Sequence, residues 1–545
     1  MTTPNARWRN ASQTGRQPDS AARVMMMQAR ITPAASSALR VAAIVSLLAL
    51  ICLMTFVPLG SNDVWLQAKI GEIIVTTGSI PTRLLFPFAW IQSNRFNAHE
   101  WLPSIVFHLV DRTLGLNQTN YVTGGFGLLL FGGTAALAKR LADNLAIGLM
   151  AAGAAMVVAN YRSDLRPELF GLVLMVALLH VLWGYQQSRR RRRLLWSIPI
   201  AVLWANCHGS FVLGPVLAAL FFVGELVESL RGSGWSVSWR QFVDGLRAAL
   251  PYGAAAFGMT LASLVNPLGA ELLRFAVALS SSEVTRAYID EWKPTLSPEF
   301  IGRPFFVAFA VAALVSLAVA LARRRRLTAT DVLLLVAFGA LALQRIRFMV
   351  FFGFVAFPVC ARLLHGAWQA RKAERVLFGT IAAVSAIGIA VVVRFGNMMG
   401  AYPYASPSYN FTEPMIRLLA RPEMQGNVFN SYALGAELIY RAYPRLRPSI
   451  DSRIDSYGDQ YFLLQDQLLR DEYLLDEFIA DFDIRYMLIY WREFEQLKKM
   501  ESLQKNWKLE FADHKMVLLR RSGPPVRLPP SAPTPRQTGL RGSHP

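Results

Sequence analysis

The sequence predicts a membrane helix bundle with several spans, followed by a small outward α/β domain. The chain of 545 residues is 53% hydrophobic and only 17% charged, whereas a soluble chain carries about 25% charged residues. Several apolar stretches reach the roughly 17–20 residues that cross a bilayer, among them 41–59, 169–183 and 376–393. The residues after 394 have instead the mixed composition of a soluble domain.

The net charge of +20 could indicate a nucleic-acid partner, but the distribution of the charge excludes one. The basic residues fall mostly in short clusters beside apolar stretches, where the positive-inside rule places them. The three cysteines, Cys52, Cys207 and Cys360, lie in or beside apolar stretches without metal-ligand spacing. We interpret them as small buried hydrophobic residues.

The N-terminal residues 1–40 are predicted to be a disordered, basic cytoplasmic tail. About 40 residues with many arginines precede the first apolar run, and no small-residue cleavage site follows that run. An uncleaved anchor therefore fits better than a signal peptide.

Residues 41–394 form the predicted transmembrane bundle, for which we count about eleven spans. The fifth and ninth spans are short. Residues 101–114 read as an amphipathic helix at the interface, and the alternative of a further span is disfavoured by their charges. The predicted spans are 41–59, 117–137, 144–160, 167–185, 194–207, 209–229, 247–265, 304–322, 329–344, 347–364 and 376–394.

Charge supports this order of spans. If the N-terminus is cytoplasmic, the strong basic clusters between spans, such as 189–193 and 323–326, all fall on the cytoplasmic side, as the positive-inside rule requires. The opposite side receives a long first outward loop, 60–116, and everything after Arg394. The outward loops carry mixed polar groups, which points to chemistry on that face.

The outward part, 395–523, is predicted to be a soluble α/β domain. GNVFNSYALGAELIYRAYP begins with β-prone residues and continues with helical character, and FDIRYMLIYW reads as a buried strand. Residues 465–482 read as an amphipathic helix, and WKLEF-ADH-KMVLL reads as a hairpin. The Pro-rich residues 524–545 are predicted to be disordered.

Two outward positions are candidate catalytic residues. Asp63 directly follows the first span, where a carboxylate can accept a proton from a hydroxyl or hold a divalent cation. His99 and Glu100 form a second polar pair, in FNAHEWLPS. Adjacent residues do not share a helix face, so one of the two can face a substrate while the other anchors the next helix. The structural alternatives are a helix-end cap or a solvated loop carboxylate for Asp63, and an interfacial cap for the pair.

The candidate substrate-binding residues include three arginines that lie on the outward side, against the positive-inside rule. They are Arg166, Arg345 and Arg347. Binding a phosphate is one reason for such arginines. Glu168 lies near them, although a carboxylate in the first turn of a helix is also explained by the helix dipole.

Asn206 and His208 complete this set of candidates, because they lie between two predicted spans with almost no loop. Hydrogen bonding between helices is the alternative for both. Together the outward residues indicate a proton acceptor beside anion-binding groups at the lipid surface, as a lipid-linked phosphate substrate would require.

Several stretches resemble the GT-C superfamily of membrane glycosyltransferases, and most closely a group of bacterial GT-C-like proteins of unsettled substrate. The resemblance covers most of 41–490. It rests on DVWLQAKIGEIIVTTGSIP, NAHEWL, LRPELF, WANCHGSFVLG, NPLG, GNVFNSYALGAELIY and PSIDSRIDSYG.

The resemblance implies transfer of a sugar from a polyprenyl-phosphate carrier to a glycan, lipid or protein acceptor. The transfer takes place on the outward face of a bacterial inner membrane. The loop carboxylate, Asp63 here, acts as general base or binds a divalent cation. The chain departs from the pattern where relatives tend to have Trp-Trp-His, because Val64-Trp65-Leu66-Gln67 follows Asp63.

Two other classes stay open at the level of sequence. A non-catalytic envelope assembly protein would use its outward domain, with Asp451, Arg453 and Asp455, to bind a partner. A lipid or solute transporter would show paired repeats with polar sites near the bilayer midplane. Here no repeat is evident, and the polar groups lie at span ends.

Overall fold

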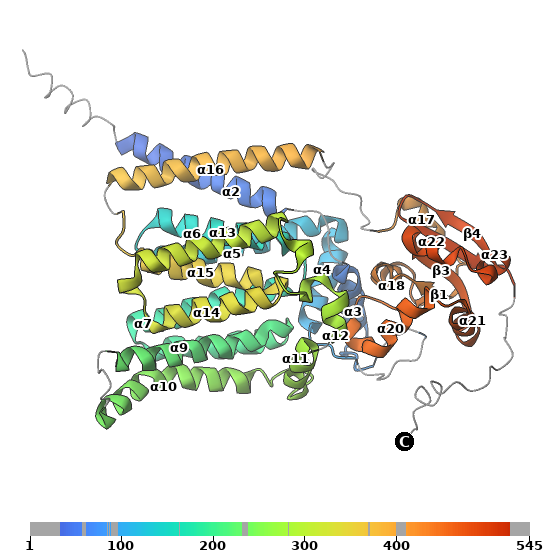
Figure 1. Cartoon of the computed structure of the whole chain (residues 1–545), viewed down its shortest axis with the longest axis horizontal. Coiled ribbons are helices and arrows are strands. Elements are labelled where there is room, and N and C mark those ends of the chain that lie inside the picture. The colour runs from blue at the N-terminus through green and yellow to red at the C-terminus, as the bar shows by residue number, and fades with distance from the viewer. Residues whose placement is uncertain are drawn as a thin grey trace, which may run out of the picture.

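A computed structural model describes residues 33–56, 62–83, 85–86, 88, 96–162, 164–231, 238–281, 283–368, 371–398 and 410–523. It contains a bundle of long helices, a layer of shorter helices at one end of the bundle, and a domain with a small sheet beyond that layer (Figure 1). Residues 1–32 of the predicted N-terminal tail and the predicted disordered tail 524–545 lie outside the described residues. Residues 33–40 already belong to the first helix.

The long helices of the bundle lie nearly side by side (Figure 1). Neighbours in sequence pack together, as α9 does with α10 and α5 with α6. Helix α2, the first of the bundle in sequence, packs against α16, the last. The bundle helices are α2 (Pro33–Thr55), α5 (Thr119–Ala142), α6 (Leu145–Ala159), α7 (Glu168–Ser188), α8 (Ser197–Ala205), α9 (Leu213–Leu230), α10 (Trp239–Ala262), α13 (Pro304–Ala322), α14 (Ala329–Gln344), α15 (Met349–Leu363) and α16 (Arg371–Met398).

The prediction of a multi-pass membrane protein is confirmed. Within the described residues, 8 helical stretches are long and apolar enough to cross a membrane. Each of the three other predicted spans also contains a helix, but α8 has only 9 residues and α14 has 16. Helix α10 has 24 residues but carries several charged ones. The count of eleven spans stays a prediction.

The basic loops between spans meet at the bundle end away from the sheet domain. Arg326 donates to the carbonyl of His365, whose ring Nδ1 lies 3.0 Å from the Leu141 carbonyl. Nearby, Arg362 Nε donates to Asp331 Oδ1 at 2.7 Å. The ends of α5, α14 and α15 are thereby held together, as expected if these loops share one side of a membrane.

The first outward segment differs from the prediction, because much of 60–116 is helical. Its two helices are α3 (Asp63–Thr77) and α4 (Trp101–Leu114). Helix α3 ends at Gly78, which adopts a left-handed conformation (φ 66°) and donates its N–H to the Ile74 carbonyl. This conformation favours glycine. Helix α4 is the predicted amphipathic helix, and it packs against α3.

Close contact between α3 and α4 depends on Gly71. A Cβ atom at this position would lie 2.0 Å from the carbonyl oxygen of Ser104 on α4, well inside van der Waals contact. The two backbones can therefore approach this closely only because residue 71 has no side chain.

Short helical segments complete the bundle end that faces the sheet domain. They connect the long helices and carry many of the polar residues of that end. They are η2 (Asn160–Arg162), η4 (Gly209–Val212), α11 (Glu271–Ser281), α12 (Glu283–Tyr288), η5 (Asp290–Trp292) and η8 (Ile346–Phe348).

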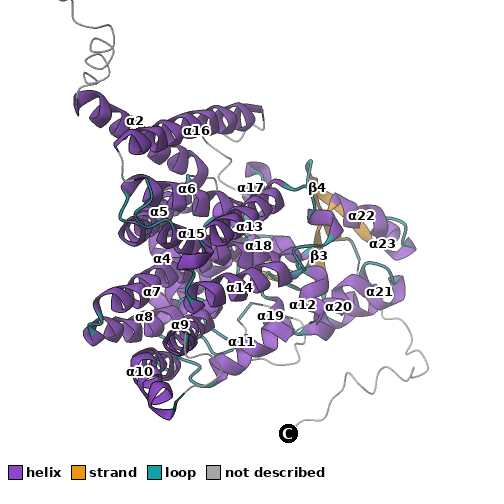
Figure 2. Cartoon of the chain, turned by 60° about the vertical axis from the view of Figure 1, so that its left-hand side comes forward, coloured by secondary structure: helices purple, strands orange, loops and turns teal. Residues whose placement is uncertain are grey.

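The C-terminal domain is built on a five-stranded sheet of order β2-β1-β3-β5-β4, flanked by helices (Figure 2). Strand β1 pairs in parallel with β2 and β3, whereas β5 pairs antiparallel with β3 and β4. The strands are β1 (Gly426–Asn430), β2 (Leu446–Pro448), β3 (Ile484–Tyr490), β4 (Trp507–Ala512) and β5 (Met516–Arg521). The helices are α17 (Glu413–Leu419), α18 (Gly435–Ala442), α19 (Ile454–Tyr457), α20 (Asp459–Leu468), α21 (Glu472–Asp481), α22 (Trp491–Leu497) and α23 (Glu501–Asn506).

This domain confirms the predicted α/β class, including the buried strand β3 and the β4–β5 hairpin. The single helix predicted over 465–482 is wrong. Two helices, α20 and α21, occupy this region, and Asp471 caps the second by accepting the Leu474 N–H at 3.1 Å. An aspartate favours this N-terminal position over a helix interior.

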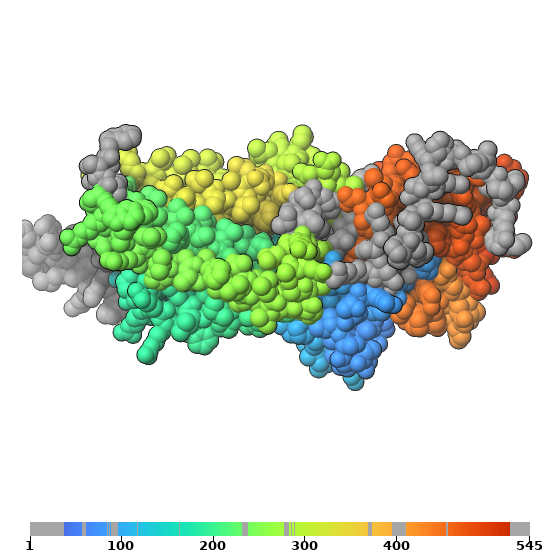
Figure 3. Space-filling view, turned by 90° about the horizontal axis from the view of Figure 1, so that it is seen from below, coloured from blue at the N-terminus to red at the C-terminus, as the bar shows by residue number. Residues whose placement is uncertain are grey.

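Helix α18 docks the domain onto α3 and α4. The Tyr440 hydroxyl lies 2.9 Å from both carboxylate oxygens of Asp111 on α4. The Tyr440 ring packs 5.0 Å from that of Trp65 on α3, and Arg441 lies over the same indole at 4.9 Å. In Figure 3 the blue segment that contains α3 and α4 lies between the bundle and the orange-red domain. The two helices thus form the base on which the domain rests.

We predict that Gly71→Ala separates α3 from α4 and destabilises the protein by about 1–3 kcal/mol, the usual cost of overpacking. The matched control is Gly132→Ala on α5, where an added Cβ atom would meet nothing within 4 Å. Thermal unfolding of the detergent-solubilised chain measures both variants. Equal midpoints for the two variants would contradict the proposed close contact.

Candidate active site

A cavity of about 920 Å³ lies where the bundle, the α3–α4 layer and the C-terminal domain meet. Its walls come from segments far apart in the sequence. Asp63 and Glu100 line it from the α3–α4 layer, Arg166 and Arg347 from the bundle, and Arg453 from the C-terminal domain. The cavity therefore exists only when all three parts are assembled.

Asp63 is the first residue of α3, and its side chain lines the cavity. The N-terminus of a helix stabilises negative charge. Burial nevertheless raises the pKa of Asp63 above its usual value. The carboxylates of Glu100 and Glu291 raise this pKa further, whereas Arg166 lowers it. A carboxylate with a raised pKa is better suited to accept a proton than an ordinary surface aspartate.

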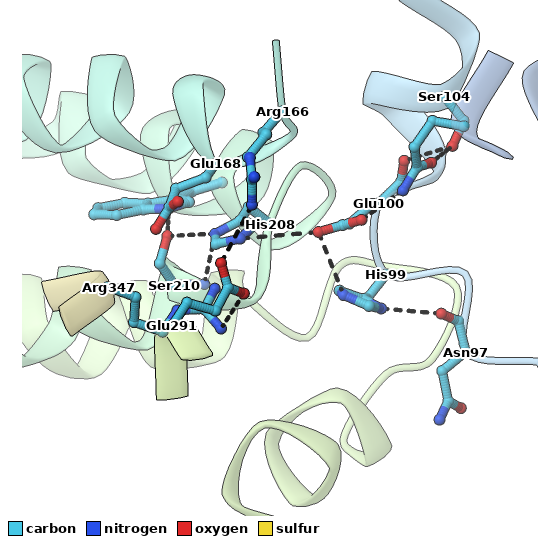
Figure 4. Close-up of polar contacts among 12 residues, drawn as sticks. Asn97, His99, Glu100, Ser104, Arg166, Glu168, His208, Ser210, Glu291 and Arg347 are labelled. Carbon is cyan, nitrogen blue, oxygen red and sulfur yellow. Dashed lines mark hydrogen bonds and ion pairs between the residues drawn. The ribbon is translucent and has the colours of Figure 1, made fainter. Parts of the chain in front are cut away.

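Glu100 lies between two histidines, as Figure 4 shows. Its Oε1 is 3.6 Å from His99 Nε2 and 3.8 Å from His208 Nε2. Its Oε2 accepts a hydrogen bond from Gln67 Nε2 at 2.5 Å. Burial raises the pKa of Glu100, but the charged form of His99, with a smaller contribution from Arg347, outweighs burial and lowers the pKa below its usual value. Glu100 is therefore held as a carboxylate.

The partners of the histidine Nδ1 atoms indicate their tautomers. The backbone N–H of Ser210 donates to His208 Nδ1 at 3.1 Å, so the proton of the neutral ring is on Nε2, facing Glu100. Burial lowers the pKa of His208 to about 3, which keeps this ring neutral near pH 7. His99 Nδ1 lies 3.0 Å from the Asn97 carbonyl, which can only accept a hydrogen bond, so this nitrogen carries a proton.

Three arginines converge on one carboxylate, Glu291 of η5. Arg162 donates to Glu291 Oε2, and Arg166 Nη1 lies 3.2 Å from the same oxygen. Arg347 Nη1 lies 3.7 Å from Oε1 and stacks over the ring of Trp292 at 4.4 Å. Burial raises the pKa of Glu291, but the three arginines outweigh burial and lower the pKa far below its usual value.

Two of these arginines have further carboxylate partners. Arg162 Nε donates to Glu168 Oε2 at 2.5 Å, and Arg166 Nε donates to Asp164 Oδ2 at 2.8 Å. Among the described residues, Glu291 is the carboxylate that lies within 4 Å of Arg347, and this is the longest ion-pair distance of the group. Arg347 therefore has the most to gain from a further anion in the cavity.

The structure brings most of the sequence-predicted site residues together. Asp63, His99, Glu100, Arg166, Glu168, His208 and Arg347 all line the cavity. The two other predicted residues, Asn206 and Arg345, are not among the described residues that line the cavity. Asn206 Oδ1 accepts from Trp101 Nε1 at 2.7 Å, and its amide donates to the Val202 and Val265 carbonyls, both at 2.8 Å. Arg345 lies over Trp292 at 5.0 Å.

Sequence reasoning missed several lining residues. These include Arg162, four residues before Arg166, and Glu291. Three outward arginines were themselves a signal that a carboxylate should lie nearby. Tyr432 and Arg453 line the cavity from the C-terminal domain, and only the docking of that domain shows their place.

The described residues do not provide a set of ligands for the expected divalent cation. Within the described part of the chain, no group of three or more histidine, cysteine, aspartate or glutamate side chains is arranged to hold a metal ion. The Nδ1 atoms of His99 and His208 are already used in hydrogen bonds to the backbone. We therefore derive no step through a metal ion.

Solved structures with the same fold include an archaeal oligosaccharyltransferase. The enzyme from Archaeoglobus fulgidus, tethered to an acceptor peptide that contains the NVT sequon, matches with a TM-score of 0.55 at 12% identity, over 88% of this chain and 74% of the other. The same organism's AglB, in complex with an inhibitory peptide and a dolichol-phosphate, matches with a TM-score of 0.50 at 14% identity. That match covers 83% of this chain and 69% of the other.

Comparisons with protein-family models and with curated proteins found no match. A structure of ArnT from Cupriavidus metallidurans bound to undecaprenyl phosphate aligns at 14% identity over 90% of this chain and 98% of the other, with a TM-score of only 0.35. The chain shares the fold of these oligosaccharyltransferase structures.

We predict that Glu291→Gln lowers the stability of the protein by roughly 3 kcal/mol, as is typical when one partner of a buried ion pair is removed. Because the pKa of Glu291 is lowered in the folded state, its contribution is full above the usual value of 4.5 and is lost as the pH falls below that value. The difference between wild type and variant should therefore be largest near pH 7 and shrink below about pH 4.5.

Thermal unfolding between pH 3.5 and pH 7.5 measures this difference. The control is Glu299→Gln, which removes a partly exposed carboxylate 3.5 Å from Lys293 and should change stability by less than about 1 kcal/mol. A Glu291→Gln effect that does not depend on pH would contradict the ion-pair assignment.

Proposed function

We propose that the protein is a glycosyltransferase of the bacterial inner membrane. It transfers a sugar from a polyprenyl-phosphate carrier to a cell-envelope acceptor on the outward face. The observation that carries this proposal is the cavity itself, in which a carboxylate suited to accept a proton, Asp63, faces the arginines gathered around Glu291. The GT-C fold supports the proposal, because the related AglB structure contains dolichol-phosphate.

The proposed reaction divides the cavity between two roles. Asp63 removes the proton from the acceptor hydroxyl, whose oxygen then bonds to the anomeric carbon of the sugar. The bond between that carbon and the carrier phosphate oxygen breaks, and polyprenyl phosphate leaves. Arg166 and Arg347 stabilise the charge on the leaving phosphate, since guanidinium groups match phosphate geometry. Glu100, fixed by Gln67 and the histidines, positions the acceptor.

The orientation follows from the charge of the loops. The clusters 189–193 and 323–326 mark the cytoplasmic side under the positive-inside rule. The cavity and the C-terminal domain then face the periplasm, which is where a lipid-linked sugar would be delivered. The apolar flanks of the cavity, among them Leu66, Phe305 and Phe351, suit the first isoprene units of the carrier.

We predict that Asp63→Asn lowers turnover by roughly two orders of magnitude or more, because it removes the base while keeping the side-chain shape. The full chain in lipid nanodiscs is supplied with a panel of polyprenyl-phosphate sugars and an envelope lipid extract, and the release of free polyprenyl phosphate is measured. The matched control is Glu72→Gln on the same helix, whose carboxylate pairs with Lys69 at 2.9 Å.

Glu72→Gln should retain wild-type turnover. Turnover retained by Asp63→Asn would remove the assignment of the base. Absence of turnover in the wild type with every donor would contradict the proposed function and favour an assembly role for the outward domain.

We predict that Arg347→Lys raises the KM for the lipid-linked donor about tenfold, because lysine keeps the charge but loses the two-pronged hydrogen bonding. Arg345→Lys is the control, since Arg345 lies two residues away and outside the cavity lining. Initial rates over a range of donor concentrations measure the effect. Equal shifts in both variants would contradict a phosphate contact by Arg347.

A further inference from the structure

A second, smaller pocket of about 140 Å³ lies inside the C-terminal domain. It opens where β1 ends, at Asn430 and Ser431, and where the chain leaves β2, at Ile450. The carboxyl ends of neighbouring parallel strands are a common place for ligands to bind. Tyr432 lines both this pocket and the large cavity, so the two are adjacent.

Part of the polar lining is already used to hold the fold. The Asn430 side chain donates to the Ile450 carbonyl at 2.8 Å and accepts from the Ser449 N–H at 2.9 Å. The Ser431 hydroxyl accepts from the Tyr490 N–H at 3.0 Å and donates to Glu493. These bonds fix the strand ends and the position of Glu493, and they leave other groups to meet a ligand.

Gln465 of α20 supplies such a group. Its Nε2 is buried and has no hydrogen-bond partner among the described residues, and Gln465 lines the pocket. A buried donor without a partner is unfavourable, so its presence needs a reason. A ligand that accepts this hydrogen bond would supply the reason.

The other lining residues restrict the chemistry of that ligand. Asp466 and Glu493 are the charged residues of the described lining, which contains no lysine or arginine. Burial raises the pKa of Glu493, although the hydrogen bond from Ser431 partly offsets this rise. An anionic ligand such as the carrier phosphate is therefore disfavoured here, whereas hydroxyl groups can donate to these carboxylates and accept from Gln465.

The remaining walls are aromatic. The rings of Tyr432 and Phe462 meet edge to face with centroids 5.3 Å apart, and Phe429 adds a third ring. Aromatic faces pack well against the C–H face of a sugar. A cavity of about 150 Å³ holds a benzene molecule, so a pocket of this size takes the ring of one sugar if the hydroxyl substituents extend through its opening.

We propose that this pocket is a subsite for one neutral or amino sugar ring of the acceptor, bound by Gln465, Glu493 and the aromatic pair of Tyr432 and Phe462. This proposal rests on the proposed function, because only a transferase has an acceptor. Tyr432 lines both pockets, so a ring bound here would lie next to the cavity that contains Asp63. The acceptor is then itself a glycan.

The test measures binding rather than turnover. The full chain in nanodiscs is titrated with the methyl glycosides of glucose, galactose, mannose, N-acetylglucosamine and glucosamine, and saturation-transfer NMR follows binding. Gln465→Met keeps the side-chain length and removes the amide, including the long hydrogen bond of 3.5 Å that its Oε1 accepts from Ser449 Oγ, so it should fold normally and weaken binding about tenfold. Gln467→Met, an exposed position on the same helix, should leave binding unchanged.

A second variant, Glu493→Gln, should also weaken binding, and thermal midpoints show whether each variant is folded. Binding of no glycoside, or equal binding by wild type and Gln465→Met, would overturn the proposal. Asp63→Asn separates the two proposals, because it should leave glycoside binding intact. If Gln465→Met weakens binding while the wild type shows no turnover, the sugar subsite stands and the transferase function falls.

Discussion

The ion pairs between Glu291 and three arginines hold the candidate site together. Arg162 and Arg166 both lie in the connection between α6 and α7, and Arg347 lies in η8 before α15, so the carboxylate of Glu291 joins these two connections to η5. Bringing three guanidinium groups together without a counter-charge would be unfavourable at this depth. Glu291 makes the arrangement possible, and the guanidinium groups of Arg166 and Arg347 remain on the cavity lining, where a phosphate could meet them.

The opposite wall depends on a packing constraint. Gly71 allows α3 to lie directly against α4, and this contact sets Asp63 and Gln67 on one helix beside Glu100 on the segment that leads into the other. Helix α18 then packs on the same pair through Tyr440. The carboxylates and the C-terminal domain are thus positioned by one set of contacts, which explains why the cavity has walls from both.

Much of the fold could be predicted from the sequence, because a bilayer demands long apolar helices and places basic loops on one side. The same rule made Arg166 and Arg347 stand out. It could not separate Arg347 from Arg345, since spacing alone does not show which of the two faces the cavity from η8. It also missed α3, whose residues are buried on most sides and show no simple polar face. Arg453 reaches the cavity through docking of the domain, which local sequence does not encode.

The central claim is that the large cavity binds the phosphate of a polyprenyl carrier between Asp63 and the arginines. A cryo-electron microscopy structure of the full chain in nanodiscs with undecaprenyl phosphate tests it most directly. We expect phosphate density within hydrogen-bonding distance of Arg347 or Arg166, with the isoprene tail leaving between the bundle helices. Phosphate density at the opposite, basic end of the bundle, with this cavity empty, would contradict it.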